Sequence, residues 1–504
     1  MSLAAAFARR AHELPGRPAM RDDADSVLDA GTVWRQAGAL AATLRDHGTR
    51  PGDRVCWSGR NDPGLLVTLL ACQRLGAVFV PLNFRATPAE LGAALALVEP
   101  RVVVEHPATA PAHEDLTALA PVWLAWPSAA SATTACDDEP PAPCDPDDLA
   151  VLVFTSGSSG QPKAVMLSHA NLWWSARNLE VSLGLRPDDV TLAVAPMFHI
   201  GGLNAFTLDT LRRGGTVVVR RAFDPARTLD DLAHGGVTTV FGVPAMYAAV
   251  ARCPGFAHAD LSGVRAALVG GAPVPAHLVA SYARQGTPLH PSWGMTEAAP
   301  SGTLLTPPPR DGAPTCSVGT PLPYLRVRLV DPDTGDVVTG PGRRGELTIS
   351  GPQVTRGYWR NPAATAAALV DGWLRTGDLA VRDADGGLRV VGRRTEVINT
   401  GGEKVVPGDV EAALAELDVR DLLVVGVPDA TWGDVVVAVL ECDPCTAPTL
   451  DEVRQVAGRQ LARYKLPKAV IALPELPRTA SGKVDRCAVR ALAAERLAHG
   501  AVTH

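Results

Sequence analysis

The chain of 504 residues has no excess of positive charge and no long hydrophobic run. Its formal net charge is −6, which argues against a broad nucleic-acid-binding surface because such a surface concentrates basic residues. No stretch approaches the roughly 20 consecutive apolar residues of a membrane span. Near the start, Arg9, Arg10 and Pro15 interrupt the apolar stretch that a signal peptide requires. We therefore expect a cytoplasmic protein with no nucleic-acid partner and no membrane partner.

Lysine is scarce. Only five of the 47 basic residues are lysine, and they stand at positions 163, 404, 465, 468 and 483. Where arginine is the default cation, each lysine invites a functional reason, and a compact charge beside phosphate is one such reason. The nine cysteines are scattered and odd in number, which indicates reduced thiols and not a disulfide framework.

Apolar runs alternate with helical stretches through the first part of the chain. Residues 102–104 and 217–219 are examples of the runs, and residues 89–98 of the helices. The alternation predicts α/β layers with mostly parallel sheets. Residues 127–148 are rich in Ala, Pro, Ser and Asp without periodicity, so we expect a surface connection there between two halves of a large domain.

The pattern changes near residue 316. From about 316 to 395, short β-rich pieces are separated by Asp/Gly turns, which predicts an antiparallel, β-barrel-like subdomain. The last part of the chain is typical of a compact α+β unit, with helices expected at 407–416, 450–463 and 485–497 and strands at 422–427 and 435–441. We thus predict a large N-terminal α/β domain over 1–395 and a small C-terminal domain over 396–504.

The strongest chemical signal is LAVLVFTSGSSGQPKAVMLSHANL, residues 149–172. A buried strand enters a turn that carries Lys163 and is rich in hydroxyls and glycine: Thr155, Ser156, Gly157, Ser158, Ser159 and Gly160. Glycines let backbone N–H groups approach phosphate oxygens, hydroxyls donate hydrogen bonds, and lysine supplies charge. No Gly-Lys-Ser/Thr opens a helix here, so this is not a Walker motif. A flexible Ser/Gly loop is the alternative.

Further segments follow this turn in the order that they have in the adenylate-forming superfamily. Taken together, the segments make the chain resemble that superfamily, which includes acyl-CoA synthetases, adenylation domains of peptide synthetases and luciferases. The resemblance extends from residue 149 to residue 483. SWGMTE, residues 292–297, is similar to the family's YGMTE segment. The similarity implies that Trp293 lies by adenine, Thr296 touches phosphate and Glu297 holds Mg²⁺. The rest of that nucleotide-binding segment is Ser292, Gly294 and Met295.

Three more segments resemble family motifs. VGGAP, residues 269–273, implies nucleotide contacts from Gly271, Ala272 and Pro273. WLRTGD, residues 373–378, implies that Asp378 accepts hydrogen bonds from the ribose hydroxyls, with Arg393 at the hinge as a second ribose contact. PRTASGK, residues 477–483, implies that Lys483 neutralises charge as a carboxylate attacks the α-phosphorus.

In the family the small domain is mobile and swings about the hinge after adenylation. The resemblance implies that residues 396–411 then receive coenzyme A. Gly401 and Gly402 would admit the pantetheine arm, and Lys404 would contact the nucleotide.

PMFHIGGLN, residues 196–204, resembles the segment that lines the family's acid pocket. His199 is implied as a gate, with Gly201 and Gly202 beside it, and a merely packed histidine is an equally open alternative. Peptide synthetases for α-amino acids have an aspartate here, and its absence favours an acid without an α-ammonium group. The other pocket candidates are apolar or small, which favours a hydrophobic aryl, alkyl or ring-bearing acid: Phe241, Gly242, Val243 and Gly270.

The resemblance implies an ATP-dependent, AMP-forming acid–thiol ligase that uses ATP, Mg²⁺ and coenzyme A. Two alternatives stay open. One is a half-reaction specialist, which makes acyl-AMP for an acyl carrier protein or thiolates acyl-AMP from a partner adenylating enzyme. The other is a non-catalytic nucleotide- or acyl-binding protein. Three departures bear on the first alternative: Ala164 replaces a glycine, Trp293 a tyrosine and Thr395-Glu396 a Lys-Asp pair. A methyl at position 164 would restrict the backbone if φ there were positive.

The role of Lys483 is testable by separating the two half-reactions. Lys483→Ala is expected to abolish acyl-AMP formation and to spare thiolation of supplied acyl-AMP, because the lysine stabilises charge in the first step alone. Pyrophosphate exchange and thioester formation measure the two steps. Equal loss of both would contradict this role.

Overall fold

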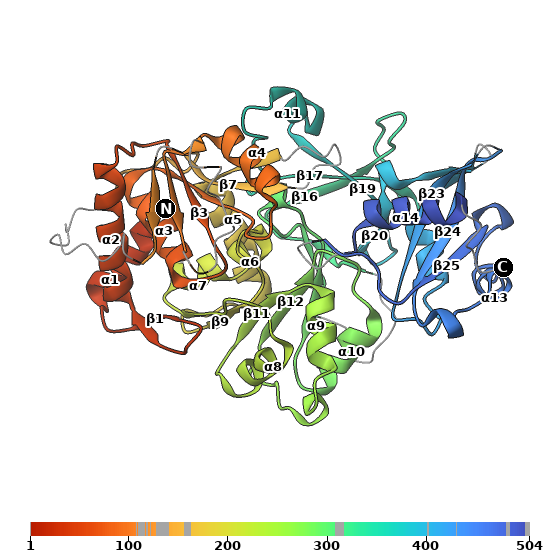
Figure 1. Cartoon of the computed structure of the whole chain (residues 1–504), viewed down its shortest axis with the longest axis horizontal. Helices are drawn as coiled ribbons and strands as arrows, with labels where there is room; N and C mark the ends of the chain where they lie inside the picture. Colours follow the sequence, from red (N-terminus) through yellow and green to blue (C-terminus); the bar gives the residue numbers. More distant parts are fainter. Residues whose placement is uncertain are drawn as a thin grey trace. The chain divides into compact units, whose positions relative to one another are not determined.

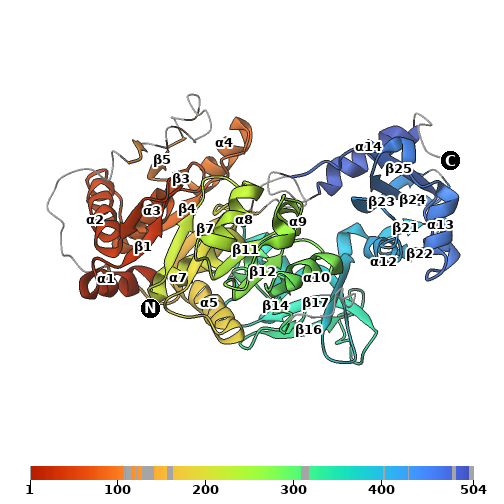
Figure 2. The ribbon, with the colours of Figure 1, turned by 90° about the horizontal axis from the view of Figure 1, so that it is seen from below.

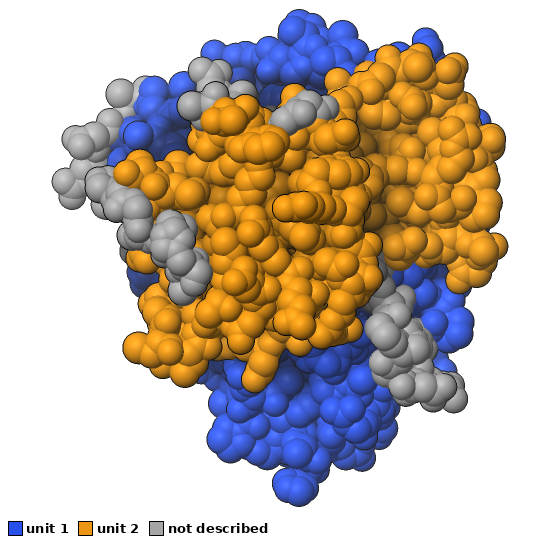
Figure 3. Space-filling view, turned by 90° about the vertical axis from the view of Figure 1, so that its right-hand side faces the viewer, with its two compact units in different colours: residues 1–327, 349–374 blue, residues 328–348, 375–504 orange. Residues whose placement is uncertain are grey.

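The computed structural model describes residues 2–106, 108, 116, 119–120, 122–127, 141–155, 163–307, 317–400, 403–429, 431–479 and 484–498. The chain divides into two compact units, which Figure 3 colours separately. One unit contains residues 1–327 and 349–374, and the other contains residues 328–348 and 375–504. The predicted boundary between 395 and 396 stays a prediction.

Two sheets form the frame of the first unit (Figures 1 and 2). Except for its last pair, which is antiparallel, the seven-stranded sheet is parallel, in the order β13 (Leu289–Ser292), β12 (Ala266–Gly270), β11 (Thr239–Gly242), β9 (Val190–Ala193), β10 (Thr216–Val219), β1 (Pro18–Arg21) and β2 (Val27–Asp29). The six-stranded sheet has the order β6 (Trp123–Ala125), β5 (Val102–Glu105), β3 (Arg54–Ser58), β4 (Val78–Pro81), β7 (Leu149–Thr155) and β8 (Lys163–Ser168). Among the strand pairs described for this sheet, β7–β8 is antiparallel and the others are parallel.

Both faces of these sheets are buried, because side chains alternate between faces along a strand. Val217 and Val219 join the cluster that contains helices α1 (Leu3–Glu13), α2 (Ala30–Asp46) and α3 (Pro63–Leu75). Val218 joins the cluster under α8 (Pro225–His234), α9 (Pro244–Ala251) and α10 (Ala276–Arg284). In the second sheet, Val103 faces α4 (Pro88–Val98) while its neighbours face the α1–α3 cluster. The unit is thus layered helix, sheet, helix, sheet, helix, as the α/β prediction required.

Local sequence signals set the helix ends. Helix α3 begins after Asp62, whose carboxylate accepts from the Gly64 N–H, and it ends at Gly76, where φ is +68°. Helix α4 begins with a capping box between Thr87 and Glu90.

An antiparallel sheet occupies the range predicted to be barrel-like. Its order is β16 (Arg326–Val330), β17 (Arg344–Ser350), β19 (Trp373–Arg382) and β18 (Leu369–Val370), and β20 (Leu388–Arg393) pairs with β19. The C-terminal α+β part has a sheet in the order β22 (Glu403–Val405), β21 (Ile398–Thr400), β24 (Gly433–Glu441) and β23 (Asp421–Asp429), and β25 (Ala469–Leu473) pairs with β24. Its helices are α12 (Pro407–Ala413), α13 (Leu450–Ala457) and α14 (Arg486–Ala498).

The main differences from the sequence prediction are helix lengths. Helix α13 ends at Ala457, although a helix was expected to continue to 463, because Gly458 closes it with a hydrogen bond to the Arg454 carbonyl. Helix α12 likewise ends before 416. None of the helices in the described parts of the chain is both long and apolar enough to cross a membrane.

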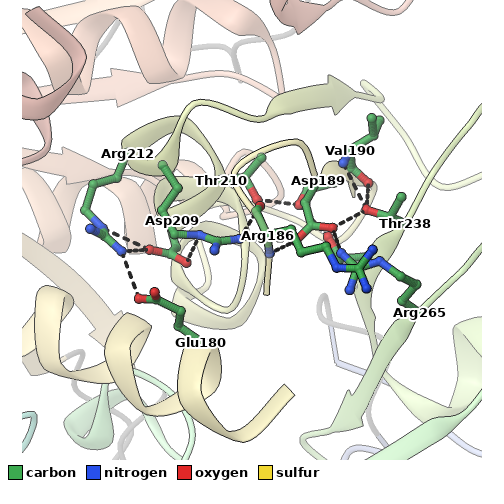
Figure 4. A network of polar contacts seen from close by, with 12 residues as sticks. Glu180, Arg186, Asp189, Val190, Asp209, Thr210, Arg212, Thr238 and Arg265 are labelled. Atoms are coloured by element: carbon green, nitrogen blue, oxygen red, sulfur yellow. Dashed lines mark hydrogen bonds and ion pairs between the residues drawn. The ribbon is translucent and has the colours of Figure 1, made fainter. Parts of the chain in front are cut away.

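A buried carboxylate fastens the amino ends of the large parallel sheet (Figure 4). Asp189, 1% exposed, stands directly before β9. It accepts from the Arg186 N–H at 2.6 Å and the Thr238 hydroxyl at 2.7 Å. It also pairs with the guanidinium groups of Arg213 and Arg265. Because Thr238 and Arg265 precede β11 and β12, one side chain joins three strand starts.

Asp189→Asn is expected to destabilise the first unit by about 3 kcal/mol, because an amide nitrogen would replace an oxygen that accepts from buried donors. The midpoint of thermal unfolding measures this loss. Asp230→Asn is the matched control, since the Asp230 side chain is 75% exposed and should matter little. Equal midpoints for the two variants would contradict the role of Asp189.

Candidate active site

Four of the predicted site segments lie together at the carboxyl-terminal ends of strands in the large parallel sheet. They follow the carboxyl ends of β9, β11, β12 and β13, and the registers Gly242↔Val269 and Gly270↔Ser292 place those ends level with one another. Ligands of open parallel sheets bind at these strand ends. The structure therefore brings together the predicted acid-pocket and nucleotide segments, and the Asp189 network lies at the opposite ends of the same strands.

Glycines at these strand ends allow neighbouring segments of the chain to pack closely against one another. A Cβ at Gly201 would lie 2.6 Å from Cε1 of Phe241, and one at Gly270 would lie 2.6 Å from the Ser292 carbonyl oxygen. A Cβ at Gly202 would lie 2.4 Å from the Pro196 carbonyl oxygen. A side chain at any of these three positions would collide with its present neighbours.

Aromatic rings pack together at the predicted acid-pocket segments. The rings of Phe84 and Phe198 meet edge to face, with centroids 5.5 Å apart. The imidazole of His199, at the start of helix α6 (Ile200–Asn204), lies 4.2 Å from the Phe198 ring. Phe241 packs on Gly201 in the first turn of the same helix. The sequence analysis named His199 and Phe241 and included Phe198 in its pocket segment 196–204, but it missed Phe84, which follows β4 of the other sheet.

Asn61 joins the two sheets at their carboxyl ends. It follows β3 of the six-stranded sheet, and its amide donates to the Ala195 carbonyl at 2.9 Å. Its side-chain oxygen accepts from the Met197 N–H at 2.8 Å. Asn61 thus attaches the segment after β9 to the six-stranded sheet. No motif marked Asn61 in the sequence, because its role depends on a partner 134 residues away.

The predicted phosphate turn connects two antiparallel strands. Thr155 closes β7 opposite Lys163, the first residue of β8. The remaining predicted residues of the turn lie outside the described residues: Ser156, Gly157, Ser158, Ser159 and Gly160. The Lys163 ammonium lies 5.3 Å from the centroid of the Tyr358 ring. This ring contact is a cation–π interaction.

Ala164 fits the hairpin without strain. It pairs with Phe154 within the β7–β8 ladder and is absent from the described residues with positive φ. Its methyl group is fully buried in the cluster of Leu152 and Val80, and its carbonyl accepts from the Trp359 N–H at 2.8 Å. The departure at position 164 therefore does not distort the backbone.

Glu297 lies in a short 3₁₀ turn, Thr296–Ala298, just beyond β13. Its carboxylate is buried and accepts from the Tyr358 hydroxyl at 2.8 Å. Burial, and with it the negative charge of Glu297, raises the pKa of Tyr358, so the hydroxyl stays protonated and donates. Sequence reasoning missed Tyr358. No motif marked Tyr358 in the sequence, because its role depends on a partner 61 residues away.

A buried carboxylate that Tyr358 links to Lys163 suits magnesium. Mg²⁺ takes oxygen ligands, commonly from one or two carboxylates with substrate phosphates and water. Glu297 supplies one such carboxylate, and Thr296 stands next to it with a hydroxyl group.

Trp293 occupies the position after β13 as a packed side chain. Its indole is 8% exposed and lies against Gly302, where a Cβ would come within 2.4 Å of Cζ3. Gly294 is equally constrained, because its Cβ would lie 2.2 Å from the Pro300 carbonyl oxygen. Glycine at 302 thus makes room for tryptophan at 293. Gly271, with φ of +85°, and Ala272 and Pro273 form the exposed turn after β12.

In the second unit, the two predicted ribose contacts lie side by side. Asp378 and Arg393 face each other across β19 and β20, and Arg393 Nε lies 3.0 Å from Asp378 Oδ1. Lys404 is exposed and pairs with Asp333 at 3.1 Å. Gly401, Gly402 and Lys483 lie outside the described residues.

Ala164→Gly tests whether the methyl group limits triphosphate use. We expect a loss of about 1–2 kcal/mol in stability, from the lost buried methyl and the greater freedom of glycine in a strand. We also expect an unchanged rate of pyrophosphate exchange. A tenfold faster exchange in the variant would show that the methyl obstructs the site.

Comparison with known protein families agrees with this geometry. The model of the AMP-binding enzyme family matches residues 7–359, and the model of the AMP-binding enzyme C-terminal domain matches residues 409–483. A feruloyl-CoA synthase of an Amycolatopsis species is 42% identical over 96% of this chain and 97% of its own. An indoleacetate–CoA ligase of Aromatoleum aromaticum is 38% identical over 98% of this chain and 99% of its own.

Solved structures show the same architecture. ATP-bound MatB from Rhodopseudomonas palustris is 31% identical, with a TM-score of 0.87 over 98% of this chain and 99% of its own. The o-succinylbenzoate CoA synthetase from Bacillus subtilis, in complex with its acyl-adenylate intermediate, is 28% identical, with a TM-score of 0.85 over 96% of this chain and 98% of its own. The chain therefore belongs to the AMP-binding enzyme family, in the acyl-CoA synthetase branch of the adenylate-forming superfamily.

Proposed function

We propose that the protein joins an aryl or other ring-bearing carboxylic acid to coenzyme A, with ATP converted to AMP and pyrophosphate. Two groups of side chains at or just beyond the carboxyl ends of strands in the two sheets support this proposal. One is formed by the rings of Phe84, Phe198 and Phe241, here called the aromatic floor, and the other is the Glu297 carboxylate, which Tyr358 links to Lys163. The family assignment supports the activity. The relatives named above are a CoA synthase and a CoA ligase.

The reaction has two steps. A carboxylate oxygen of the acid attacks the α-phosphorus of ATP, and pyrophosphate leaves. The thiolate sulfur of coenzyme A then attacks the carbonyl carbon of acyl-AMP, and AMP leaves with the bridging oxygen. No protein nucleophile is needed, so catalysis rests on positioning and charge stabilisation.

Each set of residues has a proposed task. Lys163, with the turn that begins at Thr155, binds the β- and γ-phosphates. Glu297 would hold Mg²⁺, which when bound neutralises phosphate charge, and Thr296 would contact a phosphate. Trp293 and residues 271–273 border the adenine. Asp378 accepts from the ribose hydroxyls and Arg393 orients it by their ion pair. Lys483 would stabilise charge during adenylation.

The aromatic floor supports a ring-bearing acid. Phe84, Phe198 and Phe241 offer ring faces and edges, and aromatic pairs gain about 0.5–1.5 kcal/mol beyond the area they bury. The relatives are named for ferulate, indoleacetate and 2-succinylbenzoate, all acids with a ring. His199, whose ring packs against Phe198, would border the bound acid.

Coenzyme A is the acceptor that we propose, because the relatives are CoA synthases and ligases. The unstrained backbone at Ala164 removes one reason to consider a half-reaction specialist. An acyl carrier protein as acceptor and a cytoplasmic location stay predictions.

A panel of acids tests the proposal. With ATP, Mg²⁺ and coenzyme A, a ring-bearing acid such as ferulate or indole-3-acetate should give both pyrophosphate and a CoA thioester. Its kcat/KM should exceed that of a linear acid of similar size by about tenfold or more, which corresponds to about 1.4 kcal/mol of differential binding. A preference for the linear acid would contradict the substrate class. Pyrophosphate release without any CoA thioester would contradict the acceptor.

A further inference from the structure

We propose that Tyr358 is a positioning residue that holds the Glu297 carboxylate ready for Mg²⁺ and keeps it separate from the Lys163 ammonium. This inference rests on the proposed function, in which Lys163 meets phosphate and Glu297 meets the metal. Tyr358 would touch neither ligand.

Tyr358 contacts both charged groups with different parts of its side chain. Its hydroxyl donates to Glu297 Oε1 at 2.8 Å, and its ring faces Lys163 Nζ at 5.3 Å from the centroid. A phenol suits this position because its ring face attracts cations while its hydroxyl donates to anions.

The backbone fixes Tyr358 between these partners. It forms a β-bridge with Val165, two residues beyond Lys163, and its N–H donates to the Thr365 hydroxyl at 3.0 Å. On either side, Gly357 accepts from the Met166 N–H at 3.0 Å and Trp359 donates to the Ala164 carbonyl at 2.8 Å. The main chain of Tyr358 is therefore paired with β8, the strand that carries Lys163.

Glu297 is attached to the same segment. Its carbonyl oxygen accepts from the Thr355 N–H at 2.8 Å, three residues before Tyr358. Gly357, with φ of +137°, makes the bend between these contacts, and a Cβ there would lie 2.4 Å from Cγ2 of Thr365. Residues 355–358 thus link the main chain of Glu297 to strand β8, which begins with Lys163.

Separation of the two charges has a chemical consequence. A direct Lys163–Glu297 ion pair would satisfy each group with the other and compete with phosphate and metal. Within the described parts of the chain, neither residue takes part in an ion pair. Tyr358 occupies a single lone-pair site of a carboxylate that has about four, so the others can bind a metal ion.

Removal of the hydroxyl alone tests this role. Tyr358→Phe keeps the ring beneath Lys163 and deletes the donor to Glu297. Loss of a partner that orients a metal ligand commonly weakens metal affinity by about 10–100-fold. We therefore expect the increase in ATP affinity that Mg²⁺ produces to be about tenfold smaller in the variant, while ATP affinity in EDTA stays within about twofold of the wild type.

Isothermal titration of ATP into the full-length protein, without acid or coenzyme A, measures both affinities. Tyr324→Phe is the matched control, because the Tyr324 side chain is 39% exposed and packs on Trp174 instead. It should behave as the wild type. A merely structural role for Tyr358 would lower ATP affinity equally in Mg²⁺ and in EDTA, and that result would overturn the inference.

A double-variant cycle asks whether Tyr358 acts through Glu297. In a Glu297→Gln background, Tyr358→Phe should change ATP affinity less than twofold in either buffer. A full tenfold effect in that background would overturn the inference while leaving the proposed function intact. A wild-type protein that binds no ATP in either buffer would overturn both.

Discussion

The alignment of strand ends is the constraint on which the site depends. Parallel strands β9, β11, β12 and β13 end level with one another, and Asn61 fastens the segment after β9 to the other sheet with two hydrogen bonds. Both sheets therefore deliver their carboxyl ends to one place. The aromatic floor exists because of this arrangement, since Phe84 comes from one sheet and Phe198 from the other.

The amino ends and the carboxyl ends of the strands in the large sheet are held by different kinds of contact. At the amino ends, Asp189 is buried among guanidinium, hydroxyl and amide donors, and these contacts hold three strands in register. At the carboxyl ends, glycines at 201, 202 and 270 leave no side chain between packed segments. Buried polar contacts therefore hold the amino ends of the strands, and close packing at glycines holds the segments at their carboxyl ends.

Much of the fold could be predicted from the sequence, because short continuous apolar runs such as 102–104 and 217–219 indicate strands buried on both faces. The family motifs singled out Glu297, Asp378 and Arg393, and the roles that these motifs imply for them stay predictions, although Asp378 and Arg393 do lie side by side. Asn61, Phe84 and Tyr358 could not be predicted in this way. Each acts through a contact between segments far apart in the chain, and no local pattern reports such a contact. Ala164 shows the converse, since its motif departure suggested strain that the strand geometry does not contain.

The proposed function depends on one step, the attack of the carboxylate of a ring-bearing acid on the α-phosphorus of ATP at the carboxyl ends of these strands. The most direct measurement is turnover of an acid labelled with ¹⁸O in both carboxylate oxygens, followed by mass spectrometry of the products. The account predicts one ¹⁸O in AMP and one in the CoA thioester, because the bridging oxygen leaves with AMP. Label in pyrophosphate or inorganic phosphate, or unlabelled AMP beside a labelled thioester, would contradict it.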